Sequence, residues 1–456
     1  MYNNKEALFL RNLIVGANTQ IPLSNGEYVT AINFDNAATT PPFFDVLRDV
    51  MNFAPWYSSI HRGNGHKSLQ SSKVFEEGRD TIKKFVNAVD PRDILIYTKN
   101  TTESINILSY KLYQQNKDQV IISTDMEHLA NELPWRNKFK VDFVVTDNYG
   151  VLTLADLENK LRKYAGKVGL VTVTGASNVT GHINPINKIA VLAHQYGAKV
   201  LVDGAQLVPH ASIDMKGYDS PEHIDYLAFS AHKMYAPFGI GVLIGPKDIF
   251  SQAEPVYKGG GDVRLVSRDF IEWHDSPAKD EAGTPNILGI IALLAAISTI
   301  NRVGMRVISE HERHLINYLI AGLQNIPGVV LYGHRDKNED RVSLISFNIE
   351  GIYHQALAAM LSMEAGIAVR SGLFCAHPYV ESLLKISREE LDYCHGNQDA
   401  DLPGMVRVSL GLYNNYQEID TFLTVLNKIA RNKKYYIYKY QGVLAKVASP
   451  FTEKYQ

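Results

Sequence analysis

Cysteine is scarce in this chain of 456 residues, which has only Cys375 and Cys394. Two cysteines in so long a chain argue against a disulfide framework, and they are too few for a zinc site unless several histidines contribute. An excess of charge of one sign is also missing, since 46 Lys and Arg residues nearly balance 48 Asp and Glu residues. The net charge of −2 gives no indication of nucleic acid or an anionic membrane as a partner.

A membrane-length apolar run is absent as well. The longest apolar run, 287–300, is shorter than the roughly 20 residues that a bilayer requires. We therefore expect a buried helix there, with Thr284 and Pro285 as its start signal, and no transmembrane segment. The first residues lack the uninterrupted apolar core and the cleavage site of a secretory signal, so we predict a cytoplasmic protein.

Strand-like and helix-like segments alternate between residues 93 and 245. Strands are predicted at 93–98, 119–124, 141–146, 169–174, 199–203, 226–230 and 241–245. Helices are predicted between them at 101–115, 154–164 and 186–196. This alternation predicts an α/β fold with a mainly parallel seven-stranded sheet that helices cover on both faces. We assign residues 31–295 to this large domain, and residues 1–30 together with 296–456 to a smaller α+β domain.

Two of the predicted strands end in polar side chains with complementary chemistry. Strand 199–203 ends at Asp203, and Lys233 follows strand 226–230 closely. Open α/β sheets bind ligands at the carboxyl ends of their strands. An Asp that keeps a pyridinium protonated and a Lys that bonds to an aldehyde are the pair that pyridoxal phosphate (PLP) enzymes use. Each residue alone is explained by a solvent-facing strand end, but the two together predict a PLP site.

The chain resembles the class V aminotransferase family of fold-type I PLP-dependent transferases, and within it the cysteine desulfurase and selenocysteine lyase branch. The resemblance is carried by Asp-Gly-Ala-Gln at 203–206 and Ser-Ala-His-Lys at 230–233. It is also carried by Asn-Phe-Asp-Asn-Ala-Ala-Thr-Thr at 33–40 and Arg-Val-Ser-Leu-Gly-Leu-Tyr-Asn at 407–414. The basic, aromatic tail after Ala430 lies beyond the resemblance, and we expect a solvated terminal helix there.

The resemblance implies a set of cofactor contacts. Lys233 would hold PLP covalently, Asp203 would keep its ring nitrogen protonated, and His128 would stack on its ring. Asn178 and Gln206 would reach the phenolate oxygen. The phosphate contacts would be Thr101, Thr102, Ser230, His232 and, from a partner subunit, Thr284. The Thr284 contact implies a homodimer with shared active sites.

The turn before helix 101–115 also suits a phosphate on chemical grounds. The free N–H groups of a helix start bind anions, and Thr101 and Thr102 are N-cap candidates. A helix cap without any ligand has the same local sequence. The assignment of this turn to the phosphate therefore depends on the resemblance.

Cys375 lies between Arg-Ser-Gly-Leu-Phe and Ala-His-Pro. A free Cys among apolar residues is usually core filler, whereas a Cys on a short loop near cations can react as a thiolate. The pattern Arg-x-Gly-x-x-Cys-Ala at 370–376 resembles the loop that carries the sulfur-accepting Cys in one group of desulfurases. Leu373 and Phe374 depart from the His-His that these enzymes commonly have, which leaves the substrate open. Residues 385–403 are expected to form an enlarged loop near the site.

Four residues are implied as substrate contacts. Arg407 matches the family arginine that binds an amino-acid α-carboxylate, a role that suits the planar fork of a guanidinium. Arg370 is expected to assist it. Asn36 lies in a segment that is near the substrate in the family, and His61 lies in a His-Arg-Gly loop that reaches the site in relatives. For His61 a solvated turn is the default explanation.

These assignments predict a PLP-dependent cysteine desulfurase that converts L-cysteine to L-alanine and leaves the sulfur on Cys375 as a persulfide. In this hypothesis Lys233 removes the α-proton and His128 shuttles a proton. A selenocysteine lyase, another C–S lyase or an amino-acid epimerase on the same scaffold remain alternatives, because the Cys loop decides between them. A sulfur-acceptor protein is a candidate partner, and no metal is expected.

Overall fold

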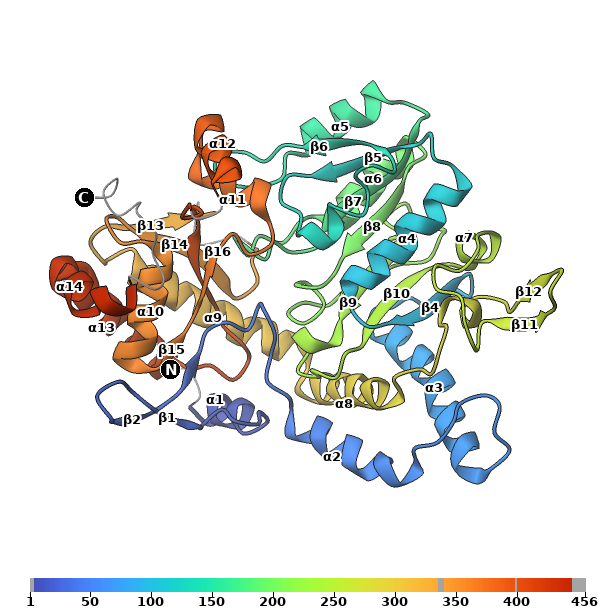
Figure 1. Ribbon diagram of the computed structural model, residues 1–456, viewed down its shortest axis with the longest axis horizontal. Helices are drawn as coiled ribbons and strands as arrows, with labels where there is room; N and C mark the ends of the chain where they lie inside the picture. Colours follow the sequence, from blue (N-terminus) through green and yellow to red (C-terminus); the bar gives the residue numbers. More distant parts are fainter. Residues whose placement is uncertain (1–3, 335–339, 398–399, 445–456) are drawn as a thin grey trace.

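A seven-stranded sheet forms the centre of the larger part of the molecule (Figure 1). The computed structural model describes residues 4–334, 340–397 and 400–444. In spatial order the strands are β4 (Asp93–Thr98), β10 (Gly241–Pro246), β9 (Tyr226–Ser230), β8 (Lys199–Asp203), β7 (Val168–Thr174), β5 (Val120–Thr124) and β6 (Lys140–Val144). The neighbouring strands β9, β8, β7, β5 and β6 pair in parallel with one another. Strand β10 runs antiparallel to both of its neighbours, β4 and β9. The predicted mainly parallel sheet of seven strands is therefore confirmed.

Helices cover both faces of this sheet, which explains why its strands are apolar throughout. Every residue of β5, β9 and β10 is buried. Successive residues of a strand point to opposite faces. Leu201 accordingly packs in a cluster with α4 (Thr101–Gln115), whereas Val200 and Val202 pack with α6 (Ile186–Gln195) and α8 (Ile287–Val303). Strands buried on both faces read as continuous apolar runs rather than as an alternating pattern.

Helices α4 and α8 begin at Thr101 and Ile287, as predicted, but their cap residues differ from the sequence prediction. The N-cap of α4 is Asn100 rather than a Thr, and its side-chain oxygen accepts the Glu103 N–H at 2.9 Å. Helix α8 begins two residues after Pro285 because Asn286 caps it through the Gly289 N–H. In both cases Asn, which caps at least as well as Thr, lies next to the expected residue.

The predicted apolar helix is buried inside the protein, as expected. Most residues of α8 are buried. Within residues 4–334, 340–397 and 400–444, no single helix is long and apolar enough to cross a membrane. Helices α8 and α9 (Met305–Leu323) reach that length and composition only as a pair bent by 78°.

A four-stranded antiparallel sheet forms the smaller part of the molecule. Its order is β13 (Val329–Tyr332), β14 (Leu344–Ile349), β17 (Met405–Ser409) and β16 (Arg370–Gly372). Residues of α9, α10 (His354–Ala365) and α13 (Tyr416–Arg431) form the second core cluster with this sheet. The mixture of helices and antiparallel strands agrees with the expected α+β organisation, whereas the domain boundaries at 30 and 295 stay a prediction.

The N-terminal segment connects to this smaller part. Its hairpin consists of β1 (Gln20–Pro22) and β2 (Tyr28–Thr30), and β3 (Ile32–Asn33) pairs in parallel with β15 (Ile367–Ala368). Arg11, at the end of α1 (Asn4–Arg11), forms a buried ion pair of 2.7 Å with Glu418 of α13. The pairing of β3 with β15 thereby fixes the position of Asn33, the first residue of the motif at 33–40.

Part of the expected loop at 385–403 is helical, whereas the helix in the C-terminal tail was expected. The expected loop at 385–403 contains α12 (Arg388–Gly396), which Ser387 starts with a capping box, and residues 398–399 lie outside the described ranges. The tail forms a helix, α14 (Lys433–Leu444), as expected. It is not fully solvated, because Tyr436 and Tyr440 are buried and Tyr440 bonds to Glu364.

A buried ion pair fixes α4 to the loop that leads to α8. Lys111 is fully buried, and its Nζ lies 2.5 Å from Oδ1 of Asp280. The Lys111 Nζ also donates to the carbonyl of Ala253 at 3.1 Å. Burial lowers the pKa of Lys111, and the charge of Asp280 opposes that effect. The lysine charge in this interior position therefore depends on its carboxylate partner.

Removal of this carboxylate is expected to destabilise the fold strongly. The change Asp280→Asn leaves the Lys111 charge buried without a counter-ion, which costs about 3 kcal/mol in the free energy of unfolding measured by urea denaturation. Glu272→Gln, which breaks the exposed pair between Arg264 and Glu272, is the matched control and should cost less than about 1 kcal/mol. Equal losses for the two variants would contradict this account of the buried pair.

Candidate active site

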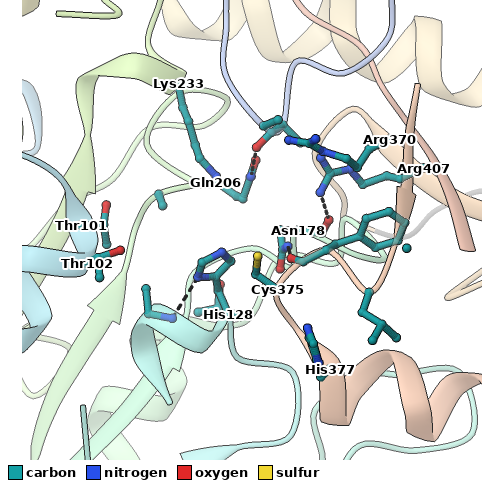
Figure 2. Close-up of a pocket in the computed structure, with 18 of the residues that line it drawn as sticks. Thr101, Thr102, His128, Asn178, Gln206, Lys233, Arg370, Cys375, His377 and Arg407 are labelled. Carbon is teal, nitrogen blue, oxygen red and sulfur yellow. Dashed lines mark hydrogen bonds between the residues drawn. The ribbon is translucent and has the colours of Figure 1, made fainter. Parts of the chain in front are cut away.

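A cavity of about 570 Å³ lies where the carboxyl ends of β7, β8 and β9 face the smaller sheet. Figure 2 shows residues that line it. Both parts of the molecule contribute to its lining. Most residues that the sequence predicted for the site line this cavity: Thr101, Thr102, His128, Asn178, Asp203, Gln206, Ser230, His232, Lys233, Arg370, Cys375 and Arg407. The fold thus brings together residues that are far apart in the chain.

Lys233 and Asp203 follow adjacent parallel strands. Asp203 ends β8, is 3% exposed, and accepts the Ala205 N–H at 2.9 Å. Lys233 ends a short 3₁₀ turn directly after β9. The pKa of Lys233 is lowered to about 8 by burial and, to a smaller extent, by the charge of Arg407, while Asp203 and Cys375 oppose this effect. A substantial share of neutral amine at neutral to mildly basic pH makes Lys233 able to act as a nucleophile or a base.

Two histidines at the cavity are neutral at physiological pH. Burial lowers the pKa of His128 to about 4, with smaller contributions from Lys233 and Arg407. Burial and Lys233 lower the pKa of His232 to about 4 as well. The Nδ1 atom of His128 accepts the Ala130 N–H at 3.0 Å, so the proton of the neutral ring is on Nε2. A neutral imidazole in this position can stack on an aromatic ring and donate through Nε2.

The start of α4 forms one end of the cavity. The Oγ of Ser230 accepts the Thr101 N–H at 2.8 Å and bonds to the Thr101 hydroxyl at 2.7 Å. Thr102 is exposed to the cavity, and His232 lies on the adjoining turn. Hydroxyls beside a helix N-terminus suit a phosphate group.

The two amides predicted for the phenolate oxygen already donate to backbone carbonyls. Gln206 Nε2 donates to Ala37 at 2.8 Å, and Asn178 Nδ2 donates to Phe374 at 2.8 Å. Each amide nitrogen has a second N–H that could serve a ligand. Their predicted cofactor contacts therefore stay predictions, and the structure adds a second role for Asn178 as a contact of the Cys375 loop.

Arg407 is a buried cation at the boundary between the two sheets. It is 3% exposed, donates from Nη1 to the Asn178 carbonyl at 2.9 Å and from Nη2 to Asp35 at 3.2 Å. Burial lowers its pKa to about 10. Arg370 lies directly opposite it in the sheet register, 3.5 Å from the other oxygen of Asp35. Two guanidinium groups share one carboxylate, so one positive charge is left for an anionic substrate group.

Cys375 lies on a tight loop between β16 and α11 (His377–Leu384). The thiol residue is exposed to the cavity. Phe374 and Cys375 have φ angles of 51° and 53°, a left-handed conformation that residues with a Cβ rarely adopt. Their carbonyls accept hydrogen bonds from Asn178 Nδ2 and from the Leu129 N–H, the latter at 2.7 Å. Figure 2 shows Cys375 between His128 and the arginines.

Three predicted residues do not line this cavity. Asn36 is 1% exposed and uses its amide in bonds to Ser409 and Asn414. His61 is exposed and pairs with Glu76 at 2.8 Å. Thr284 is exposed and lies outside the lining. The site roles of these three residues stay predictions.

The structure adds residues that sequence reasoning had not assigned. Asp35, inside the motif at 33–40, bridges the two arginines, and its position beside Asn36 was the available signal. His354 of α10 and Leu402 also line the cavity, and His354 Nε2 bonds to the Leu402 carbonyl at 3.1 Å. No sequence pattern indicated these two residues. Cys394 lines a separate neighbouring cavity of about 390 Å³.

The fold and the site define an α/β enzyme that uses a lysine placed after a strand of a mainly parallel sheet. The model of the family described as Aminotransferase class-V matches residues 32–422, so the chain belongs to the class V aminotransferase family. The match covers both sheets and all residues of the cavity. Membership of this family implies pyridoxal phosphate as the cofactor.

Relatives place the chain near the desulfurases of this family. It is 36% identical to a probable cysteine desulfurase of Synechocystis, over 93% of this chain and 97% of the relative. It is 31% identical to a cysteine desulfurase of Haloferax volcanii, over 91% and 93% of the two chains. Among solved structures, it matches the apo cysteine desulfurase of Thermococcus onnurineus with a TM-score of 0.78 and 32% identity, over 88% of this chain and 95% of that one. The predicted fold and family branch are thus confirmed.

The residues of the cavity fit pyridoxal phosphate. Asp203 is a buried acid for a ring nitrogen, and Lys233 is an amine of lowered pKa for the aldehyde. The Ser230 hydroxyl and the N-terminus of α4 are suited to the phosphate at the other end. The chemistry of this donor set matches the three polar ends of the cofactor.

The lowered pKa of Lys233 is open to a direct chemical test. In the cofactor-free protein, the pH profile of acetylation at Lys233, followed by mass spectrometry, should have its midpoint at about 8. Because the charge of Arg407 lowers this pKa, Arg407→Met should move the midpoint to higher pH. The exposed Lys67 is the internal reference and should react equally in both proteins. An unchanged Lys233 midpoint would contradict the electrostatic coupling.

Proposed function

We propose that this protein is a cysteine desulfurase that uses pyridoxal phosphate and acts on L-cysteine. The observation that carries the proposal is that Cys375, Lys233 and Arg407 line one cavity. The match to relatives named cysteine desulfurase, at 31–36% identity over most of the chain, supports the same activity. Leu373 and Phe374, which differ from the His-His that such desulfurases commonly have, directly precede the Cys375 thiol.

The arginines bind and orient the substrate. Arg407 holds the α-carboxylate of L-cysteine in a bidentate contact, and Arg370 adds charge from the more exposed side. Asp35 keeps the two guanidinium groups apart and aligned through its two oxygens. The substrate sulfur then faces the Cys375 loop.

The bound cofactor supplies an electron sink for the carbanion that forms at the α-carbon. Lys233 takes the α-proton on Nζ. The Cys375 thiolate attacks the substrate sulfur, so that a sulfur–sulfur bond forms while the carbon–sulfur bond breaks. The products are a persulfide on Cys375 and, after protonation of the β-carbon, alanine. His128 stays neutral and holds a proton on Nε2 at the cavity.

The other candidate functions differ in what Cys375 must do. A C–S lyase releases its sulfur product without storing it on the enzyme, and an epimerase leaves the carbon–sulfur bond intact. A selenocysteine lyase prefers the selenium analogue. The Cys375 loop, docked over the cavity by two hydrogen bonds, favours storage on the enzyme.

The proposal is tested with L-cysteine and the purified holoenzyme. We expect alanine in amounts that match the sulfane sulfur bound to the protein in a single turnover. Cys375→Ser should lower this alanine formation at least about a hundredfold, because the sulfur loses its nucleophilic acceptor. Lys233→Ala should abolish it. Cys394→Ser is the matched control and should retain wild-type rates.

Three outcomes would favour the alternatives. Pyruvate, ammonia and free sulfide formed from L-cysteine at an equal rate by Cys375→Ser would indicate a C–S lyase, and alanine formed from L-selenocysteine but not from L-cysteine would indicate a selenocysteine lyase. Loss of the α-proton to solvent without alanine, detected as deuterium incorporation, would indicate an epimerase. A protein that binds the cofactor but changes neither bond of L-cysteine would contradict the desulfurase proposal.

The proposed enzyme is a homodimer in which Thr284 contacts the cofactor of the other subunit. The exposure of Thr284 outside its own cavity supports this arrangement. Sedimentation should give a mass about twice the 51.0 kDa of the chain. Mixed dimers of the inactive Lys233→Ala chain with wild type should have half of the sites active. A monomer with full activity would contradict the shared site.

A further inference from the structure

Phe374 has a position that the proposed reaction steps do not use. Its ring packs against the guanidinium of Arg407, with 4.9 Å from Cζ to the ring centroid. The side chain is buried, at 9% exposure, although the next residue, Cys375, is exposed. An aromatic face on a buried guanidinium is an attractive contact, and it is stronger in a site with little water.

Three contacts link Phe374, Arg407 and Asn178 in a closed triangle. Arg407 Nη1 donates to the Asn178 carbonyl at 2.9 Å. Asn178 Nδ2 donates to the Phe374 carbonyl at 2.8 Å, and the Phe374 ring packs against the Arg407 guanidinium. The three residues come from β17, from the turn after β7 and from the Cys375 loop. Each contact therefore fixes a different segment to the same arginine.

The Cys375 loop requires such support because two of its residues have a strained backbone conformation. Phe374 and Cys375 are successive residues at φ angles of 51° and 53°. Residues with a Cβ keep this conformation only where the surroundings hold it. Besides the triangle, the surroundings provide the bond from the Leu129 N–H to the Cys375 carbonyl. The Phe374 ring is the one side chain of this strained pair that is buried, so it is the anchor of the loop.

We propose that Phe374 is a positioning residue that ties the Cys375 sulfur to the arginine that binds the substrate carboxylate. Arg407 then serves as a common reference for both reacting partners: the substrate through its carboxylate, and the thiol through the Phe374 ring. The role in sulfur transfer rests on the proposed function, whereas the docking of the loop does not. When both reacting groups are held by the same rigid residue, less entropy is lost in bringing them into the reactive geometry.

The docking is measured on the holoenzyme without substrate. The Leu129 amide reports it, because its hydrogen bond ends on the Cys375 carbonyl. Phe374→Ala should raise the rate of hydrogen exchange at this amide by about fivefold or more. Without the ring, the loop moves away more often and breaks the hydrogen bond that protects the amide. Phe374→Tyr keeps an aromatic face and should restore slow exchange. Leu373→Ala removes apolar bulk from the same loop and leaves the Phe374 contact in place, so it is the matched control.

The positioning role is measured with L-cysteine, with kcat expressed per bound cofactor. Phe374→Ala should lower kcat by about tenfold, equivalent to ~1.4 kcal/mol, because the sulfur is no longer held at the substrate. KM should stay within about twofold, since Arg407 keeps its bonds to Asp35 and Asn178. Phe374→Tyr should recover kcat. A purely structural role would lower the content of folded enzyme without this split between kcat and KM.

Three results would overturn the inference. The first is unchanged exchange at Leu129 in Phe374→Ala. The second is an equal effect of Leu373→Ala on exchange and on kcat, which would indicate general packing of the loop. The third is faster exchange with an unchanged kcat. If wild type forms no alanine from L-cysteine while Phe374→Ala still raises the Leu129 exchange, the desulfurase proposal fails and the docking of the loop stands.

Discussion

The buried guanidinium of Arg407 is the interaction on which the site depends. It bonds to Asp35 and to the Asn178 carbonyl, and it packs against the Phe374 ring. These contacts join the small antiparallel sheet to the turn after β7 of the large one, so the cavity between the sheets keeps its shape. A buried cation is costly unless its partners surround it, and here the same partners also form the site.

The charge of Arg407 also contributes to the protonation of its neighbours. Burial is the main cause that lowers the pKa of Lys233 to about 8 and that of His128 to about 4, and Arg407 acts in the same direction on both. A chain that is close to neutral overall thus contains a locally cationic cavity with a free amine and a neutral imidazole. Such a cavity favours a phosphate and an amino-acid carboxylate over neutral ligands, because each anion compensates charges that the fold has already buried.

Sequence patterns predicted the sheet well and some details poorly. The strands are buried on both faces and therefore appear as continuous apolar runs, which are easy to recognise. The cap residues of helices were harder to predict than their starts, because several neighbouring residues can form the cap, as Asn100 and Asn286 show. A motif also indicates which segment is near a site, but not which side chain faces inward: in the segment 33–40, Asp35 bridges the arginines while Asn36 is turned into the protein.

By itself the sequence determined the fold class and the chemistry available. Lys233 and Asp203 stand at strand ends, and Cys375 stands in a recognisable loop, because periodicity and motifs are properties of short segments. Only the tertiary structure decided which residues support that chemistry. The bridge of Asp35, the second role of Asn178 and the anchoring of Phe374 on Arg407 join segments far apart in the chain. Such contacts depend on strand register and on burial, which no local pattern specifies.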